Sequence, residues 1–157
     1  MTIKQTVDNW SSGVINDLKD NYYKLGLDAS GNWGQSLEDK NKVTDEQIRI
    51  EILAAKYTGA LVDGRSANRN QSPSSIRAFV GWAGNTFIKE WVERKGINAS
   101  PFAIAYKIAK EGVKVPNRFN PGTLVSDVVN EDRLDLLLDS LKEVVSVNFS
   151  SDIKKLF

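Results

Sequence analysis

Acidic side chains are the main candidates for chemistry in this chain, because two of the commonest catalytic residue types are missing. The 157 residues include no histidine and no cysteine, which removes the usual general base, the usual zinc ligands and any thiol nucleophile. Neighbouring carboxylates occur at Glu38–Asp39, Asp45–Glu46 and Glu131–Asp132. Two carboxyl groups catalyse only where their surroundings separate their pKa values, and these lie in polar segments. We therefore expect no catalytic residues, no metal ligands and no cofactor.

Positive charge gathers in the middle of the chain. The formal net charge is +1, but residues 65–118 carry 10 basic and 3 acidic side chains, against 7 and 10 in residues 1–64 and 4 and 7 in residues 119–157. A basic segment between acidic ones could contact nucleic acid, or the acidic part of a neighbouring copy in a ring. The candidate residues for contact with a partner or with DNA are Arg65, Arg69, Arg77, Lys107 and Lys110.

The stretch 91–112 predicts two helices joined by a tight turn. Gly96 suits the left-handed residue that ends a helix, and Ile97 can fold back on Val92 in a Schellman motif. Ser100 suits an N-cap with a side-chain hydrogen bond, and Pro101 suits the first position of the next helix. The pattern is that of a helix-turn-helix.

The most specific function that the residues alone suggest is DNA binding by a helix-turn-helix at residues 87–110. Its second helix would bring Lys107 and Lys110 close to phosphates. The start of that helix holds Ser100, Pro101 and Phe102 rather than the Arg, Asn or Gln that read bases. Any DNA binding is therefore expected to be independent of base sequence.

The remaining segments predict an α+β fold in a single domain, 1–157. Apolar residues at three-four spacing predict an N-terminal helix over 3–25 and a long C-terminal helix that starts after Asn130. Strands at 35–40 and 47–53 form a small antiparallel sheet (a hairpin), with the isoleucines of the second strand buried against a helix. The β-branched residues leave a strand at 144–149 as an alternative.

Between the hairpin and the helix-turn-helix pair lie a short helix or turn at 54–62 and a polar arm or loop at 66–75. Ser72 or Ser74 can cap the following helix, with Pro73 in its first turn. Gly84 is the expected break between two helices, and residues 113–115 are partly extended. Trp82 and Trp91 are the expected packing anchors.

An ordered set of short motifs resembles the neck proteins of tailed bacteriophages. The motifs are Ser30-Gly31 with Ser36-Leu37, Tyr57 with Gly64-Arg65, Trp91 with Lys95-Gly96-Ile97, and the run 105–109, AYKIA. Together they span residues 29–112 and are similar to the tail-completion, or head–tail joining, family of minor tail proteins. The chain departs from the family pattern in a longer loop after Arg65, a longer helical region at 76–87 and no "KGT" run after Gly112. Such departures would fit the large virions of crAss-like phages.

The resemblance implies a non-enzymatic structural protein of the virion neck, between the capsid portal and the tail. Its partners would be copies of itself in a 6- or 12-fold ring, the portal or connector, the tail proteins, and DNA passing through the channel. It would be made in the host cytoplasm, and no apolar run approaches the roughly 20 residues that span a membrane. The alternatives are a small non-specific DNA-binding helix-turn-helix protein, and an enzyme built on a buried pair of Asp, Glu or Lys.

Overall fold

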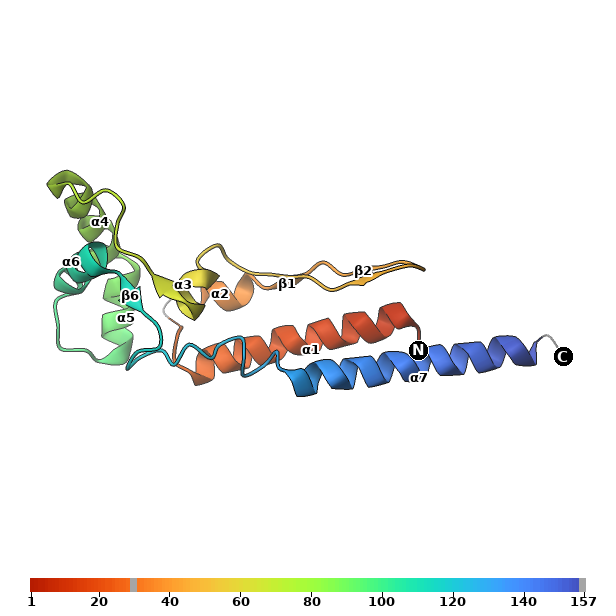
Figure 1. The fold of residues 1–157 in the computed structure, drawn as a ribbon. Helices are drawn as coiled ribbons and strands as arrows, with labels where there is room; N and C mark the ends of the chain where they lie inside the picture. Colours follow the sequence, from red (N-terminus) through yellow and green to blue (C-terminus); the bar gives the residue numbers. More distant parts are fainter. Residues whose placement is uncertain (29–30, 156–157) are drawn as a thin grey trace.

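The computed structural model is elongated and describes residues 1–28 and 31–155 (Figure 1). Two long helices run along the molecule and lie side by side over part of their length, a thin hairpin runs beside the first of them, and a lobe of shorter helices occupies one end. The described residues form seven helices and six two-residue strands. The predicted α+β class is confirmed.

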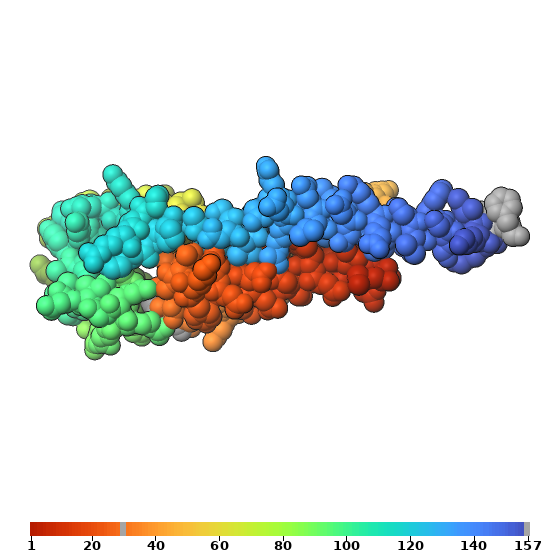
Figure 2. Space-filling model, turned by 90° about the horizontal axis from the view of Figure 1, so that it is seen from below, coloured from red at the N-terminus to blue at the C-terminus, as the bar shows by residue number. Residues whose placement is uncertain are grey.

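Helices α1 (Ile3–Lys24) and α7 (Glu131–Lys154) form the long axis. Thr2 and Gln5 close a capping box at the start of α1, and the Asn130 side chain accepts a hydrogen bond from the backbone N–H of Arg133 at the start of α7. The two helices run in opposite directions, and α7 continues past the first residue of α1 (Figures 1 and 2). Both predicted helices and the predicted Asn130 cap are confirmed.

A first hydrophobic cluster joins α1 to α2 (Asn32–Gln35), to α3 (Thr58–Val62) and to the segment that leads into α7. Trp33 is 1% exposed, packs its ring 5.0 Å from that of Tyr22, and donates a hydrogen bond to Thr58 Oγ1 at 2.8 Å. Leu124 and Val128 close the cluster from the far end of the chain. The stripe of apolar residues on α1 is therefore core, as its spacing predicts.

The hairpin keeps one register along its length. Strand β1 (Glu38–Asp39) pairs with β4 (Ile52–Leu53), and β2 (Lys42–Val43) pairs with β3 (Ile48–Arg49). The Lys40 N–H donates to the Glu51 carbonyl between the two pairs, so the ladder is continuous across the gap. The prediction of a buried isoleucine face is wrong at Ile48, which is 40% exposed, whereas Ile50 and Ile52 are half-buried and Ile52 packs against the first cluster.

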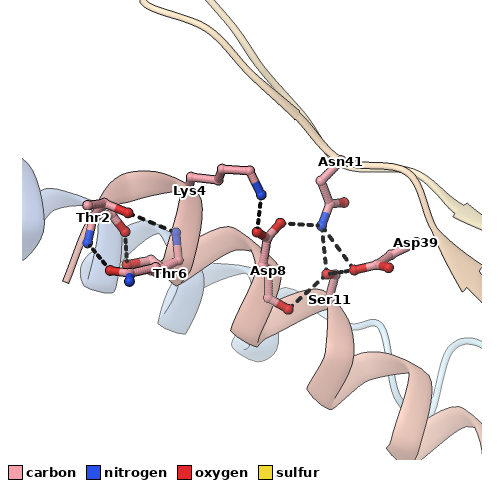
Figure 3. A network of polar contacts seen from close by, with 8 residues as sticks. Thr2, Lys4, Thr6, Asp8, Ser11, Asp39 and Asn41 are labelled. Carbon is pink, nitrogen blue, oxygen red and sulfur yellow. Dashed lines mark hydrogen bonds and ion pairs between the residues drawn. The ribbon is translucent and has the colours of Figure 1, made fainter.

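Polar side chains attach the base of the hairpin to α1 (Figure 3). Ser11 is fully buried and donates to the Asp39 carboxylate at 2.7 Å, while Asn41 Nδ2 donates to Ser11 Oγ at 2.7 Å and to Asp8 Oδ1 at 3.3 Å. Lys4 pairs with the same Asp8 carboxylate. Hydrogen bonds rather than apolar packing thus hold the hairpin at this point.

The end lobe consists of β5 (Gly64–Arg65), α4 (Pro73–Asn85), α5 (Phe87–Lys95), α6 (Pro101–Glu111) and β6 (Val113–Lys114). We call residues 64–118 the basic lobe. Strands β5 and β6 pair antiparallel and close it, a pairing that the sequence did not predict. A second cluster, formed by Ala83, Ile88, Val92 and Ala105, is its core.

The predicted helix boundaries in the basic lobe are confirmed. Helix α4 ends one residue beyond Gly84, and α5 begins at Phe87. Gly96 has φ +62°, and the Ile97 N–H donates to the Val92 carbonyl, which completes the Schellman motif. One detail is wrong: Ser100 has the extended backbone of an N-cap, but its hydroxyl makes no capping hydrogen bond.

The segment 66–72 is held against α6. The Asn68 N–H and the Gln71 side-chain amide both donate to the Ala109 carbonyl, at 2.9 Å each. Ser72 then caps α4, accepting from the Ser75 N–H at 3.3 Å, with Pro73 as the first helical residue. The predicted arm is thus a loop bound to its own lobe up to Ser72, and its last residues belong to the helix.

Helix α7 settles the alternative at 144–149 in favour of helix. The stripe that predicted it, 134, 138, 141, 145, 149 and 153, is nevertheless not buried; Leu156, its last member, lies outside the described residues. The buried residue of α7 is Leu137, 6% exposed, which lies between two members of the stripe. The spacing therefore predicted the helix correctly, but it does not mark the buried face of α7.

Candidate functional site

The predicted contact residues fall into two groups in the basic lobe. Arg69, Arg77, Lys107 and Lys110 are exposed, and none forms an ion pair within the described residues. Arg69 lies in the loop bound to α6, Arg77 on α4, and both lysines on α6. Four cations on packed, adjacent elements therefore remain free to meet an anionic surface.

Arg65 is different, because its guanidinium is used inside the lobe. Its Nη2 donates to Asn68 Oδ1 at 2.7 Å, and its Cζ lies 4.4 Å from the ring centroid of Phe79. Its Nη1 is buried and has no hydrogen-bond partner among the residues that the structure describes. The side chain thus joins β5 to the following loop and to α4, and only part of it reaches solvent.

Aromatic rings continue outward from this arginine. Phe79 contacts Trp82 at a centroid distance of 6.0 Å, and Trp82 contacts Phe87 at 5.3 Å, both edge to face. Trp82 is 61% exposed and Phe87 is 41% exposed. The structure therefore places Trp82, an expected packing anchor, on the surface rather than in the core.

Small residues lie where α4 and α6 pack together. Ala83 on α4 and Ala105 on α6 are each 0% exposed and belong to the second cluster. At Gly84 a Cβ would lie 2.6 Å from Cδ1 of Phe102, so glycine at this position makes room for the Phe102 ring against α4. The side chains of Trp82, Phe87, Phe102 and Tyr106 are nevertheless exposed.

Trp91, the other expected anchor, is half-buried against the second cluster. Its ring makes an edge-to-face contact with Phe119 at 5.1 Å. Arg118 lies over the same phenyl ring, 5.1 Å from its centroid. Trp91 thus fixes the segment that leaves the basic lobe.

A second exposed apolar surface lies on α7. We call Leu134, Leu138, Leu141, Val145, Phe149 and Ile153 the α7 stripe; all are exposed except Leu141, which is half-buried. Phe149 is 67% exposed and Leu138 is 52% exposed. Asp135 and Asp139 each follow a member of the stripe, and α7 as a whole carries six acidic and three basic side chains. Sequence reasoning missed this surface; the signal was the acidic residues beside the stripe.

The carboxylate pairs do not form a chemical site. Asp45–Glu46 is exposed at the hairpin turn, and Glu131–Asp132 is exposed in the first turn of α7. Asp39 is hydrogen-bonded to Ser11 and Asn41. Among the described residues, no group of three acidic side chains is placed to hold a metal ion. The features that the described residues do offer are the two exposed surfaces on the basic lobe and on α7.

Hydrogen bonds and nearby charges shift the pKa of one group on α7 and of one at the base of the hairpin. The hydrogen bond from Lys142 to Asp139, at 2.9 Å, and the negative charges of Asp139 and Asp135 raise the pKa of the lysine. The hydrogen bonds from Lys4 and Asn41 lower the pKa of the Asp8 carboxyl. Both shifts favour the charged forms near neutral pH.

No protein-family model matches the sequence, and neither a curated protein nor a solved structure matches the chain. In the part of the chain that the structure describes, no helix is both long and apolar enough to span a membrane. The surfaces of this molecule and the motifs of its sequence are therefore the features that bear on its function.

Proposed function

We propose that the protein is a structural, ring-forming component of a tailed-phage virion, located in the neck between the capsid portal and the tail and enclosing the DNA channel. The observation that carries this proposal is the pair of exposed apolar surfaces of opposite charge, on the basic lobe and on α7. Soluble monomers seldom leave so many large apolar side chains exposed on neighbouring positions. Partners that cover both surfaces would be copies of the same chain and the adjoining portal or tail proteins.

The resemblance of residues 29–112 to the tail-completion family supports the position in the neck. The elongated shape supports it as well, because a long subunit can contact a neighbour on each side as well as the layers above and below (Figure 1). On this proposal the protein is not an enzyme and needs no cofactor.

The neck position is tested by imaging virions of the phage that encodes the chain. Gold-labelled antibody raised against the purified protein should mark one position between head and tail. An antibody against the major capsid protein serves as the control and should mark the head. Labelling spread over the head or the tail tube, or absent from intact and neck-disrupted particles alike, would contradict the proposal.

A second function, non-specific DNA binding, is supported by the unpaired cations Arg69, Arg77, Lys107 and Lys110. Neutralising phosphates with several such cations gives an affinity that falls steeply with salt. Binding of a labelled duplex by the purified protein, measured between about 50 and 200 mM salt, tests it. A tenfold or greater loss across this range, with no neck labelling, would favour the DNA-binding protein over the virion component.

A further inference from the structure

We propose that α7 of one copy docks on the basic lobe of a second copy, with the α7 stripe against the exposed aromatic side chains around the end of α4. The proposal rests on the ring assembly proposed above and names the two surfaces that would make it. The contact is head to tail, so each copy offers both surfaces and the assembly continues from copy to copy.

Both surfaces consist of large apolar side chains that the monomer leaves exposed. On the basic lobe, Trp82 contacts Phe87, and the ring of Phe102 lies against Gly84, so these rings gather around the end of α4. Tyr106 follows one turn later on α6 and is 52% exposed. An exposed aromatic cluster of this kind accepts an apolar helix, as in helix-in-groove recognition.

The charges beside the two surfaces are opposite. Residues 64–118 carry 10 basic and 3 acidic side chains, a balance of +7. Helix α7 carries six acidic and three basic ones, a balance of −3, with Asp135 and Asp139 next to the stripe. Complementary charges at the rim of an apolar contact favour the right partner and disfavour like-charged ones.

Pairing of α7 with α7 is disfavoured by the same charges. Two stripes packed together would bring the acidic residues beside them close to one another. Docking on its own lobe is excluded by geometry, because the free end of α7 and the basic lobe lie at opposite ends of the molecule (Figure 1). The basic lobe of another copy avoids both obstacles, because its charge is opposite to that of α7 and it does not belong to the same molecule.

The test uses two charge-reversed variants of the full chain. Variant A carries Asp135→Lys and Asp139→Lys on α7; variant B carries Lys107→Glu and Lys110→Glu on α6. All four side chains are exposed, and none contributes to either hydrophobic cluster. Circular dichroism of each variant should match that of the native chain, which shows that the fold is kept.

Self-association is measured by sedimentation at concentrations up to about 1 mM, where contacts worth only about 4 kcal/mol are detected. The native chain should self-associate, and each variant alone should do so about tenfold or more weakly, because like charges then meet. An equimolar mixture of A and B should recover association, because both of its contacts join opposite charges.

Two results would overturn the docking. One is variant B associating as strongly as the native chain, which would mean that the basic lobe is not the partner of α7. The other is a native chain that stays monomeric at about 1 mM. Either result combined with gold label at the neck leaves the virion role standing, whereas recovery in the mixture without neck label leaves the contact standing and rejects the virion role.

Discussion

The two hydrophobic clusters of this molecule use their large side chains in opposite ways. In the first, around α1, the largest side chain is almost fully enclosed: Trp33 is 1% exposed and contacts Tyr22 and Thr58. In the second, in the basic lobe, Ala83 and Ala105 fill the helix contact and Trp82 remains 61% exposed. The first cluster encloses its tryptophan inside the monomer, whereas the second leaves the tryptophan of α4 outside its core, where a partner can cover it.

The two tryptophans give the largest expected difference. Trp33→Ala should lower the free energy of unfolding by about 3–5 kcal/mol, because it leaves a cavity in a core that cannot collapse fully. Trp82→Ala, its matched control, should lower it by about 1 kcal/mol or less, because only edge-to-face contacts on the surface are lost. Urea denaturation followed by circular dichroism measures both. Equal losses would show that the exposed rings belong to the core after all.

Two adjacent leucines on α7 sharpen the contrast. Leu137→Ala should destabilise the chain by about 2–3 kcal/mol, since this side chain is buried in the helix that packs along α1. Leu138→Ala should change the free energy of unfolding by about 0.5 kcal/mol or less. In sedimentation the order of the two variants should be reversed: Leu138→Ala should weaken self-association and Leu137→Ala should not. Loss of stability in both would place the stripe inside the monomer.

Two glycines of α4 test the close approach of helices in the basic lobe. A Cβ at Gly84 would meet Phe102, whereas a Cβ at Gly81 would meet nothing within 4 Å. Gly81→Ala should stabilise the chain by about 0.5–1 kcal/mol by reducing the entropy lost on folding. Gly84→Ala should come out about 1–2 kcal/mol less stable than Gly81→Ala because of overpacking. If Phe102→Ala added to Gly84→Ala did not recover stability, the steric explanation would fail.

The smallest expected effect concerns pH at the base of the hairpin. Hydrogen bonds from Lys4 and Asn41 lower the pKa of Asp8 in the folded chain below its ordinary value of 3.8. The group therefore stabilises the fold above that value, and the contribution is lost as the pH falls through the lower folded pKa. Denaturation curves of Asp8→Asn should show a shallower decrease in stability below pH 3.8 than the native chain. Identical pH profiles would contradict the assignment.

Sequence motifs whose hydrogen bonds join residues a few positions apart predicted the local structure correctly. Gly96 and Ile97 predicted the Schellman motif, Asn130 the start of α7, and Ser72 with Pro73 the start of α4, because each depends on hydrogen bonds to residues a few positions away. The stripe of α1 predicted its core face for a similar reason: the helix packs along the side that the stripe marks.

Features that depend on distant segments could not be predicted. The apolar residues of α7 have the same spacing as those of α1, yet the side of α7 that faces α1 is the side that carries Leu137. The way in which two helices pack depends on both of them and cannot be deduced from the sequence of one. The exposure of Ile48 and of Trp82 depends on how distant segments pack against the hairpin and against α4, which the spacing within each segment does not show. Of the candidate site, the cations were predicted and the acidic apolar partner surface was not.

The length of α7 has a consequence for its far end. All residues from Val145 to Lys155 are exposed, and this part of the helix extends beyond α1 (Figure 2). Lone helices of fewer than about 12–15 residues are marginal in water, since few bonds repay the cost of nucleation. The equilibrium between helix and coil in residues 145–155 therefore depends on contacts with another subunit. The amide protons of these residues should exchange rapidly with solvent until a neighbour covers them.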